Sequence, residues 1–212
     1  MSENLYTYGI IEKEDFELDV EGVAGADRIY TVDYKNFSTV VSDIDTTEPD
    51  RTDERVEAHN TVLQHVLEYD GGRTVVPMSF GMAFKSERTL KHVLRGARRA
   101  LRSTLNNIEG TVELGVKILT PADGAAPQEG IQATVTDRLA ELSINETEND
   151  LFTDRLIVNK SYLVDRDQRD VFDAAIDEIG AEYDELIINY TGPWPPYNFV
   201  DIHIGAEQRG GG

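Results

Sequence analysis

Residues 28–44 read RIYTVDYKNFSTVVSDI and decide the first part of the fold. Two runs, 28–34 and 37–44, are rich in β-branched and aromatic residues, and a short turn separates them. Such runs at this distance are typical of a β-hairpin. A third run of the same kind, 5–11 (LYTYGII), precedes them. The sequence therefore predicts three strands, of which the last two form the hairpin.

The residues after the hairpin change to helical spacing. Apolar residues at 56, 62, 63, 66 and 67 predict an amphipathic helix over 53–69, which Gly71 and Gly72 end. A short buried strand follows over 74–81, then a helix to about 106 with Ser86 as its cap, then a strand over 111–119. This order favours an α+β fold, with helices on one face of a mainly antiparallel sheet of modified ferredoxin-like kind. We expect this N-terminal domain to span 1–119.

A smaller C-terminal α+β domain is expected over 131–204. Residues 120–130 (TPADGAAPQEG) combine two prolines and two glycines with small polar residues, which is typical of a linker. Beyond them, helical patterns over 131–142 and 167–179 alternate with strand patterns over 155–164 and 183–190. The tail, 205–212, has too few apolar residues to dock, so we expect it to be mobile.

The charge of the chain is strongly negative. Its 212 residues include 40 acidic and 20 basic side chains, a net charge of −20, and 19 of the acidic but only six of the basic residues follow position 120. Because 40% of the residues are hydrophobic, this composition indicates a folded core and not a disordered chain. Only six basic residues are lysine. An anionic, lysine-poor surface suits molar salt, where the Debye length is about 3 Å. We expect a high-salt cytoplasm, as in halophilic archaea, with an ordinary acidic protein as the alternative.

Candidate catalytic and metal-binding residues are few. The chain has no cysteine, which excludes disulfides, thiolate metal sites and cysteine nucleophiles. His59, His65, His92 and His203 match no metal-ligand spacing, and we expect them to be exposed or locally bonded. The start of the chain lacks a signal-peptide pattern, and no run approaches the roughly 20 apolar residues that span a bilayer. We predict a soluble protein without catalytic residues, cofactor or metal; the rival hypothesis is an enzyme on a ferredoxin-like scaffold.

The helix predicted to end at 106 carries an unusual stripe of cations. Between 85 and 102 seven basic residues stand against a single acid, Glu87. Helical spacing puts six of them on one face and leucines on the other: Arg88, Lys91, Arg95, Arg98, Arg99 and Arg102. Three interpretations are open: neutralisation by the protein's own carboxylates, docking of an acidic partner, or contact with a phosphate backbone. The net charge argues against nucleic acid as a partner.

Residues 191–200 (TGPWPPYNFV) form the second unusual segment. Three prolines and the only tryptophan lie within it. Proline cannot donate to a β-ladder, so we expect this segment to leave the sheet in a polyproline-like extension. Its rings either complete a core, with Trp194 anchored in it, or contact a partner; a PxxP adaptor ligand is a weaker alternative. The candidate contact residues are Trp194, Pro195, Pro196, Tyr197 and Phe199.

Short motifs along nearly the whole chain resemble one known family. They are YTYGI (6–10), VS (41–42), PMSFG (77–81), VE and VK (112–113 and 116–117) and TGPWPPYNFV (191–200). Together they are similar to the gas vesicle protein F/L family (GvpF/GvpL), and closely to its haloarchaeal GvpF members. Ser79 and Met82 depart from the residues that are frequent there, and the region after Leu119 is shorter than in many bacterial members.

This resemblance implies a function in assembly. It implies a minor structural or accessory protein, in the cytoplasm or on the gas vesicle, that binds the major shell protein GvpA and other accessory Gvp proteins. It implies neither catalysis nor a cofactor. No membrane is expected as a partner.

Overall fold

The computed structural model describes residues 4–121 and 130–201. The described chain divides into two compact units: unit 2 lies within residues 110–199, and unit 1 comprises residues 4–109 together with residues 200 and 201. Both units combine helices with antiparallel sheets, which confirms the α+β class. None of the helices in the described ranges has the length and hydropathy of a membrane span.

The sheet of unit 1 is built around strand β1. Its order is β2-β3-β4-β1-β5, and the short strand β6 also pairs with β1. The predicted hairpin is confirmed as β3 and β4, and the predicted strand over 74–81 is reduced to two residues. The strands are β1 (Asn4–Glu12), β2 (Glu17–Leu18), β3 (Ile29–Tyr34), β4 (Phe37–Ile44), β5 (Val76–Pro77) and β6 (Ala83–Phe84).

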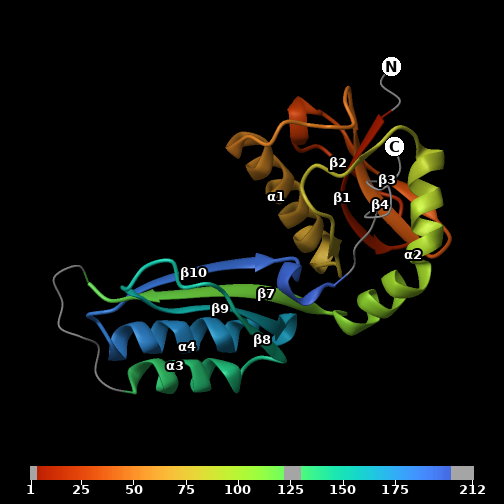
Figure 1. Ribbon diagram of the computed structural model, residues 1–212. Helices are drawn as coiled ribbons and strands as arrows, with labels where there is room; N and C mark the ends of the chain where they lie inside the picture. The colour runs from red at the N-terminus through yellow and green to blue at the C-terminus, as the bar shows by residue number, and fades with distance from the viewer. Residues whose placement is uncertain (1–3, 122–129, 202–212) are drawn as a thin grey trace. The chain divides into compact units, whose positions relative to one another are not determined.

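The two long helices of unit 1 lie on opposite faces of this sheet (Figure 1). Helix α1 (Asp53–Glu68) is capped by Thr52, whose side chain accepts a hydrogen bond from the Arg55 N–H. The helix packs on Tyr6 and Tyr8 of β1 through His59. Helix α2 (Glu87–Asn107) packs on the other face. The expectation that both helices share one face was therefore wrong. Because β1 and β4 are buried on both sides, each face needs a covering layer.

A β-bulge in β1 determines which of its residues pack against α1 and which against α2. The register between β1 and β4 shifts between Thr7 and Gly9. As a result neighbouring residues face α1: the Tyr8 ring stacks on His59, and a Cβ on Gly9 would lie 3.0 Å from Leu63 Cδ2. Ile10 then faces the core under α2. Bulges re-aim side chains in this way.

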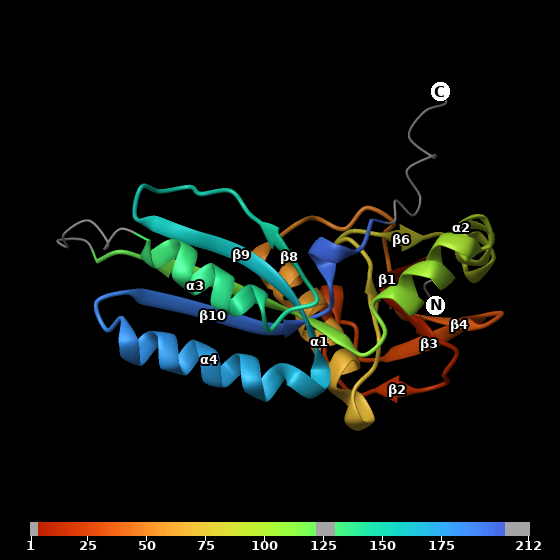
Figure 2. The same cartoon turned by 90° about the horizontal axis from the view of Figure 1, so that it is seen from below.

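Unit 2 has the complete split β-α-β arrangement of ferredoxin-like folds. Its strand order is β10-β7-β9-β8, all antiparallel, and one helix follows each of β7 and β9. Both helices cover the same face of the sheet, as Figures 1 and 2 show. The elements are β7 (Thr111–Leu119), α3 (Ile131–Ala140), β8 (Asn145–Glu148), β9 (Leu156–Asp165), α4 (Arg169–Glu182) and β10 (Ile187–Trp194).

Unit 1 has the same strand order in modified form. Its strands β5, β1, β4 and β3 follow one another as β10, β7, β9 and β8 do in unit 2. Between β1 and β3, however, the chain forms β2 and the 3-10 turn η1 (Val23–Gly25) where a ferredoxin-like fold has a helix. Helix α2 follows the last strand of the sheet instead.

The boundary between the units falls earlier than the sequence predicts. Strand β7 pairs with β9 and β10, so residues 111–119 belong to unit 2, and unit 1 ends at Glu109 before it resumes at Val200. Most of the predicted linker (residues 122–129), the predicted tail and His203 lie outside the described residues.

Candidate functional site

Helix α2 presents its two faces to different surroundings. Ser86 caps it and accepts a hydrogen bond from the Thr89 N–H. Leu90, Leu94 and Leu101 are fully buried and pack with β-strand residues of unit 1. Cationic residues occupy the opposite face of the helix. Because the leucines are buried, these cations face solvent.

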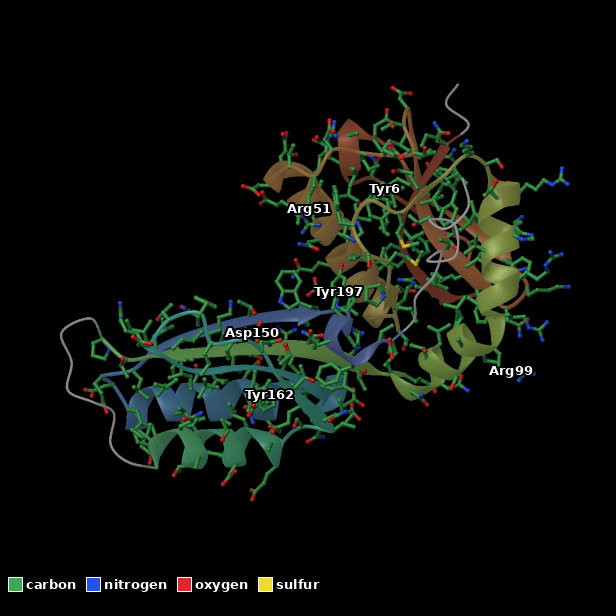
Figure 3. The ribbon with its side chains drawn as sticks, viewed as in Figure 1. Tyr6, Arg51, Arg99, Asp150, Tyr162 and Tyr197 are labelled. Atoms are coloured by element: carbon green, nitrogen blue, oxygen red, sulfur yellow. The ribbon has the colours of Figure 1, made fainter. Side chains whose placement is uncertain are left out.

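The five arginines of α2 are exposed, its lysine is half-buried, and most of these cations lack a carboxylate partner among the described residues. We call Arg88, Lys91, Arg95, Arg98, Arg99 and Arg102 the basic face. Lys91 forms an i,i+4 ion pair with Glu87, and Arg95 contacts the His92 ring. Within residues 4–121 and 130–201 the other four arginines have no carboxylate partner. Figure 3 shows the Arg99 side chain extending outward from the helix.

Arginines elsewhere in the chain behave differently. Most of those in the described part of the chain contact carboxylates, and the N–O distances of Arg28, Arg55, Arg73, Arg169 and of Arg138 to Glu182 are between 2.6 and 3.8 Å. The pairs are Arg28–Glu17, Arg55–Asp50, Arg73–Glu14, Arg138–Glu178, Arg138–Glu182 and Arg169–Asp173. Among the described residues Arg51 and Arg155 also lack a carboxylate partner, but Arg51 lies over the Phe80 ring and Arg155 donates to the Thr120 carbonyl. The basic face is thus where such arginines cluster in the described part of the chain.

The spacing of the basic face costs helix stability. Cations three or four residues apart on a helix repel by about 0.2–0.5 kcal/mol per pair at low salt. The sequence contains six such pairs: 88–91, 91–95, 95–98, 95–99, 98–102 and 99–102. Stability of the isolated unit therefore does not account for this face.

A shallow groove runs along the basic face. Its lining combines four of the arginines with small and polar residues: Tyr34, Arg95, Gly96, Arg98, Arg99, Arg102, Ser103 and Asn106. Gly96 lies in mid-helix with open space around the position of a Cβ. The groove thus offers guanidinium and amide donors beside an accessible stretch of backbone.

The segment around Trp194 stays in the sheet of unit 2, against expectation. Strand β10 continues to Trp194, which pairs with Glu113, and a register shift after Thr191 takes Gly192 and Pro193 out of the ladder. Proline is tolerated here because β10 is an edge strand and the bulge needs no donor at that position. The prediction that residues 191–200 leave the sheet in a polyproline-like extension was therefore wrong for residues 191–194.

The residues after β10 are fastened to the sheet of unit 2. The Asn198 backbone N–H donates to Glu113 Oε2 at 2.9 Å, and its side-chain amide donates to Glu113 Oε1 at 2.6 Å and to Ser161 Oγ at 2.9 Å. Trp194 is half-buried and lines a polar groove on the sheet. Pro195 and Pro196 are buried, Phe199 is half-buried, and Tyr197 is 38% exposed. These contacts favour a structural role for the segment.

A buried histidine that sequence reasoning missed organises the α1 side of unit 1. His59 is 2% exposed; its Nδ1 lies 2.9 Å from the Tyr6 hydroxyl and its Nε2 lies 3.1 Å from the Met78 carbonyl. A neutral ring that donates from Nε2 and accepts at Nδ1 satisfies both contacts. Burial lowers the pKa of His59 to about 4, with the Arg51 charge adding to the effect and the Met78 bond opposing it. The prediction of an exposed or locally bonded residue was wrong for His59, although its spacing with Val62 and Leu63 could have revealed it.

The residues around His59 are largely those of the sequence motifs. Tyr8 bonds Ser42 at 2.9 Å, and the Gly81 N–H donates to the Tyr6 hydroxyl at 3.2 Å. The Phe80 ring lies against Tyr6 and His59. Residues of the motifs 6–10, 41–42 and 77–81 are thus brought together in one cluster around His59, so packing accounts for these motifs.

Comparison with known proteins gives the family. The model of the family described as "Gas vesicle synthesis protein GvpL/GvpF" matches residues 4–128 and 122–201. The chain belongs to the GvpL/GvpF family. It is 78% identical over 212 residues to gas vesicle protein F1 of Halobacterium salinarum and 74% identical over 212 residues to gas vesicle protein F of Haloferax mediterranei, with 100% of each chain covered. Its role is therefore in gas vesicle formation, and these relatives come from halophilic archaea.

Solved structures agree on the fold. The crystal structure of GvpF from Anabaena matches with a TM-score of 0.80 at 21% identity and covers 95% of this chain and 100% of that chain. GvpF from Microcystis aeruginosa gives a TM-score of 0.80 at 20% identity, covering 94% of this chain and 100% of that chain. At these identities the likeness concerns the two-unit α+β fold.

Proposed function

We propose that this member of the GvpL/GvpF family is an accessory protein of vesicle assembly that binds the major shell protein GvpA and other accessory gas vesicle proteins. In this role it helps to nucleate the vesicle or delivers shell subunits to it. The observation that carries the proposal is the match over the complete length of haloarchaeal gas vesicle proteins F.

Shell subunits need such a protein because they would associate with one another before assembly. Apolar surfaces and open strand edges of shell subunits would pair with one another before assembly. A carrier with a net charge of −20 and an adaptable contact surface would keep a bound subunit dispersed in concentrated salt.

The geometry supports binding as the mode of action. His59, whose pKa is strongly lowered, has both ring nitrogens bonded inside a packed cluster and is 2% exposed. Its shift is therefore explained by burial. The five arginines of the basic face, in contrast, are exposed, and four of them lack carboxylate partners in the described part of the chain.

The proposal is tested by deleting the gene in a vesicle-forming host and by purifying the tagged protein at molar salt. We expect the deletion to abolish vesicles, the restored gene to rescue them, and GvpA to co-purify with the tagged chain. A deletion strain with normal vesicles, or purification without any other gas vesicle protein, would contradict it.

A further inference from the structure

We infer that the basic face of α2 is a docking surface for a carboxylate-rich segment of a partner polypeptide. The inference rests on the proposed function in taking the partner to be a protein. It goes beyond that function by naming the surface and the chemistry of the segment that binds there.

The first support is the contrast in charge pairing. The chain has twice as many acidic as basic residues, 40 against 20, so carboxylates are abundant. Five arginines on other elements use them, whereas Arg88, Arg98, Arg99 and Arg102 use none within the described ranges. A cationic surface that the protein's own carboxylates leave free is complementary to an external anion.

The second support is the identity of the cations. Five of the six residues of the basic face are arginine. At molar salt, where the Debye length is about 3 Å, attraction over longer distances is screened and only direct contacts remain effective. The planar guanidinium binds a carboxylate through two parallel hydrogen bonds, which a lysine cannot do. The composition therefore suits contact recognition of carboxylates in concentrated salt.

The third support is the shape of the surface. The groove beside Tyr34 continues past Gly96 and Ser103, where small residues leave room between flanking arginines. Nothing lies within 4 Å of a Cβ placed on Gly96. A partner backbone can approach the helix closely at this point while its acidic side chains reach Arg95, Arg98 and Arg102 on the same face.

A protein fits this face better than a nucleic acid does. A duplex is anionic along its whole length and is repelled by a chain of net charge −20. Lowering the salt concentration would strengthen contacts between arginines and phosphates, but it would also strengthen this repulsion. The groove also offers a single aromatic ring, Tyr34, and so no platform for successive bases. An acidic polypeptide segment needs only the local match.

The test uses a charge-reversed variant that should keep its fold. In Arg95→Glu/Arg102→Glu the new carboxylates lie three or four residues from Lys91, Arg98 and Arg99, so repulsive neighbours become attractive ones. The matched control, Lys85→Glu/Lys117→Glu, makes the same change in net charge at exposed lysines outside the basic face. Thermal melting at molar salt checks both folds, and Arg95→Gln/Arg102→Gln replaces the first variant if it fails to fold.

Binding is measured by fluorescence anisotropy with a labelled glutamate-rich peptide and, separately, with a short DNA duplex. We expect the wild type and the lysine control to bind the peptide, and the α2 variant to bind it at least about tenfold more weakly. Equal binding by the α2 variant would overturn the inference. Tighter binding of the duplex than of the peptide would also overturn it. A dimer of the wild-type chain that dissociates in the charge-reversed variant would overturn it as well.

Capture of GvpA in parallel separates this inference from the proposed function. If the wild type and the α2 variant capture GvpA equally, the docking surface is refuted while the proposed function stands. If the wild type binds the peptide through the basic face but captures no gas vesicle protein, the proposed function is refuted while the docking chemistry stands.

Discussion

Asn198 and Glu113 lie 85 positions apart in the sequence and are joined by two hydrogen bonds. Through them the short 3-10 turn η4 (Tyr197–Phe199) is held on strand β7 of unit 2. Glu113 is 5% exposed, so its carboxylate depends on protein donors. The end of the TGPWPPYNFV segment is thereby tied to the middle of the chain.

Replacing Asn198 with alanine should lower the free energy of unfolding by about 1–3 kcal/mol, because a buried carboxylate then keeps only the backbone donor from this turn. Urea unfolding at molar salt measures the change. Asn189→Ala, at an exposed position of β10, is the matched control and should have little effect. Equal stability of Asn198→Ala and the wild type would show that the turn is not held in this way.

Protonation of His59 should lower the free energy of unfolding at mildly acidic pH. Its pKa is lowered to about 4 in the folded state, so the unfolded chain, with a pKa near 6.5, binds more protons between these values. Stability is therefore complete above pH 6.5 and falls as the pH drops toward 4, by about 3 kcal/mol from this group.

The measurement compares unfolding free energies of the wild type and His59→Gln across this range. The variant should lose the His59 contribution and so depend less steeply on pH. Contributions common to both proteins cancel, such as that of Glu14, whose pKa the hydrogen bond from Arg73 lowers. Parallel pH curves would contradict a neutral buried histidine.

Two glycines should respond to alanine in opposite directions. Gly96→Ala should raise the free energy of unfolding by about 0.5–1 kcal/mol, because the position is helical and open. Gly9→Ala should lower it, because the new Cβ would lie 2.8 Å from Val75 Cγ1 and 3.1 Å from the Val76 carbonyl oxygen. Thermal melting of the two variants under one salt condition is the measurement. A melting temperature of Gly9→Ala that is unchanged or higher would contradict the packing of β1 against α1, and a lower one for Gly96→Ala would contradict the open helical position.

Salt should stabilise the fold. With a net charge of −20, carboxylate repulsion grows as screening is removed. Lowering potassium chloride from molar concentration to about 0.1 M, where the Debye length is about 10 Å, should lower the melting temperature. A melting temperature that is unchanged or higher in dilute salt would exclude adaptation to concentrated salt.

Local patterns predicted most elements well. The strand over 37–44, the strand over 111–119 and the start of the helix at Asp53 agree with β4, β7 and α1, because alternation, spacing and capping are properties of neighbouring residues. The exposed cations of α2 were also correctly predicted, since their leucines follow helical spacing. Local patterns do not say which sheet a strand joins: β7 was assigned to the first domain, and its partners β9 and β10 follow far along the chain.

The segment at residues 191–200 was harder to predict for the same reason. A bulge that removes Gly192 and Pro193 from the ladder depends on the register with β7, and the local sequence indicates only that proline is unsuited to a ladder. Trp194 is half-buried instead of sitting in a core, so truncation to alanine should cost less than the roughly 3–5 kcal/mol of a fully buried ring.

The central claim is that the chain binds the shell protein and keeps it dispersed. Purified GvpA, diluted from denaturant into molar salt with and without this protein, is followed by sedimentation and by light scattering. The account predicts that GvpA pellets alone and stays in the supernatant in a defined complex when the chain is present. If GvpA pellets equally in both cases, and no complex is found in the supernatant, the account is contradicted.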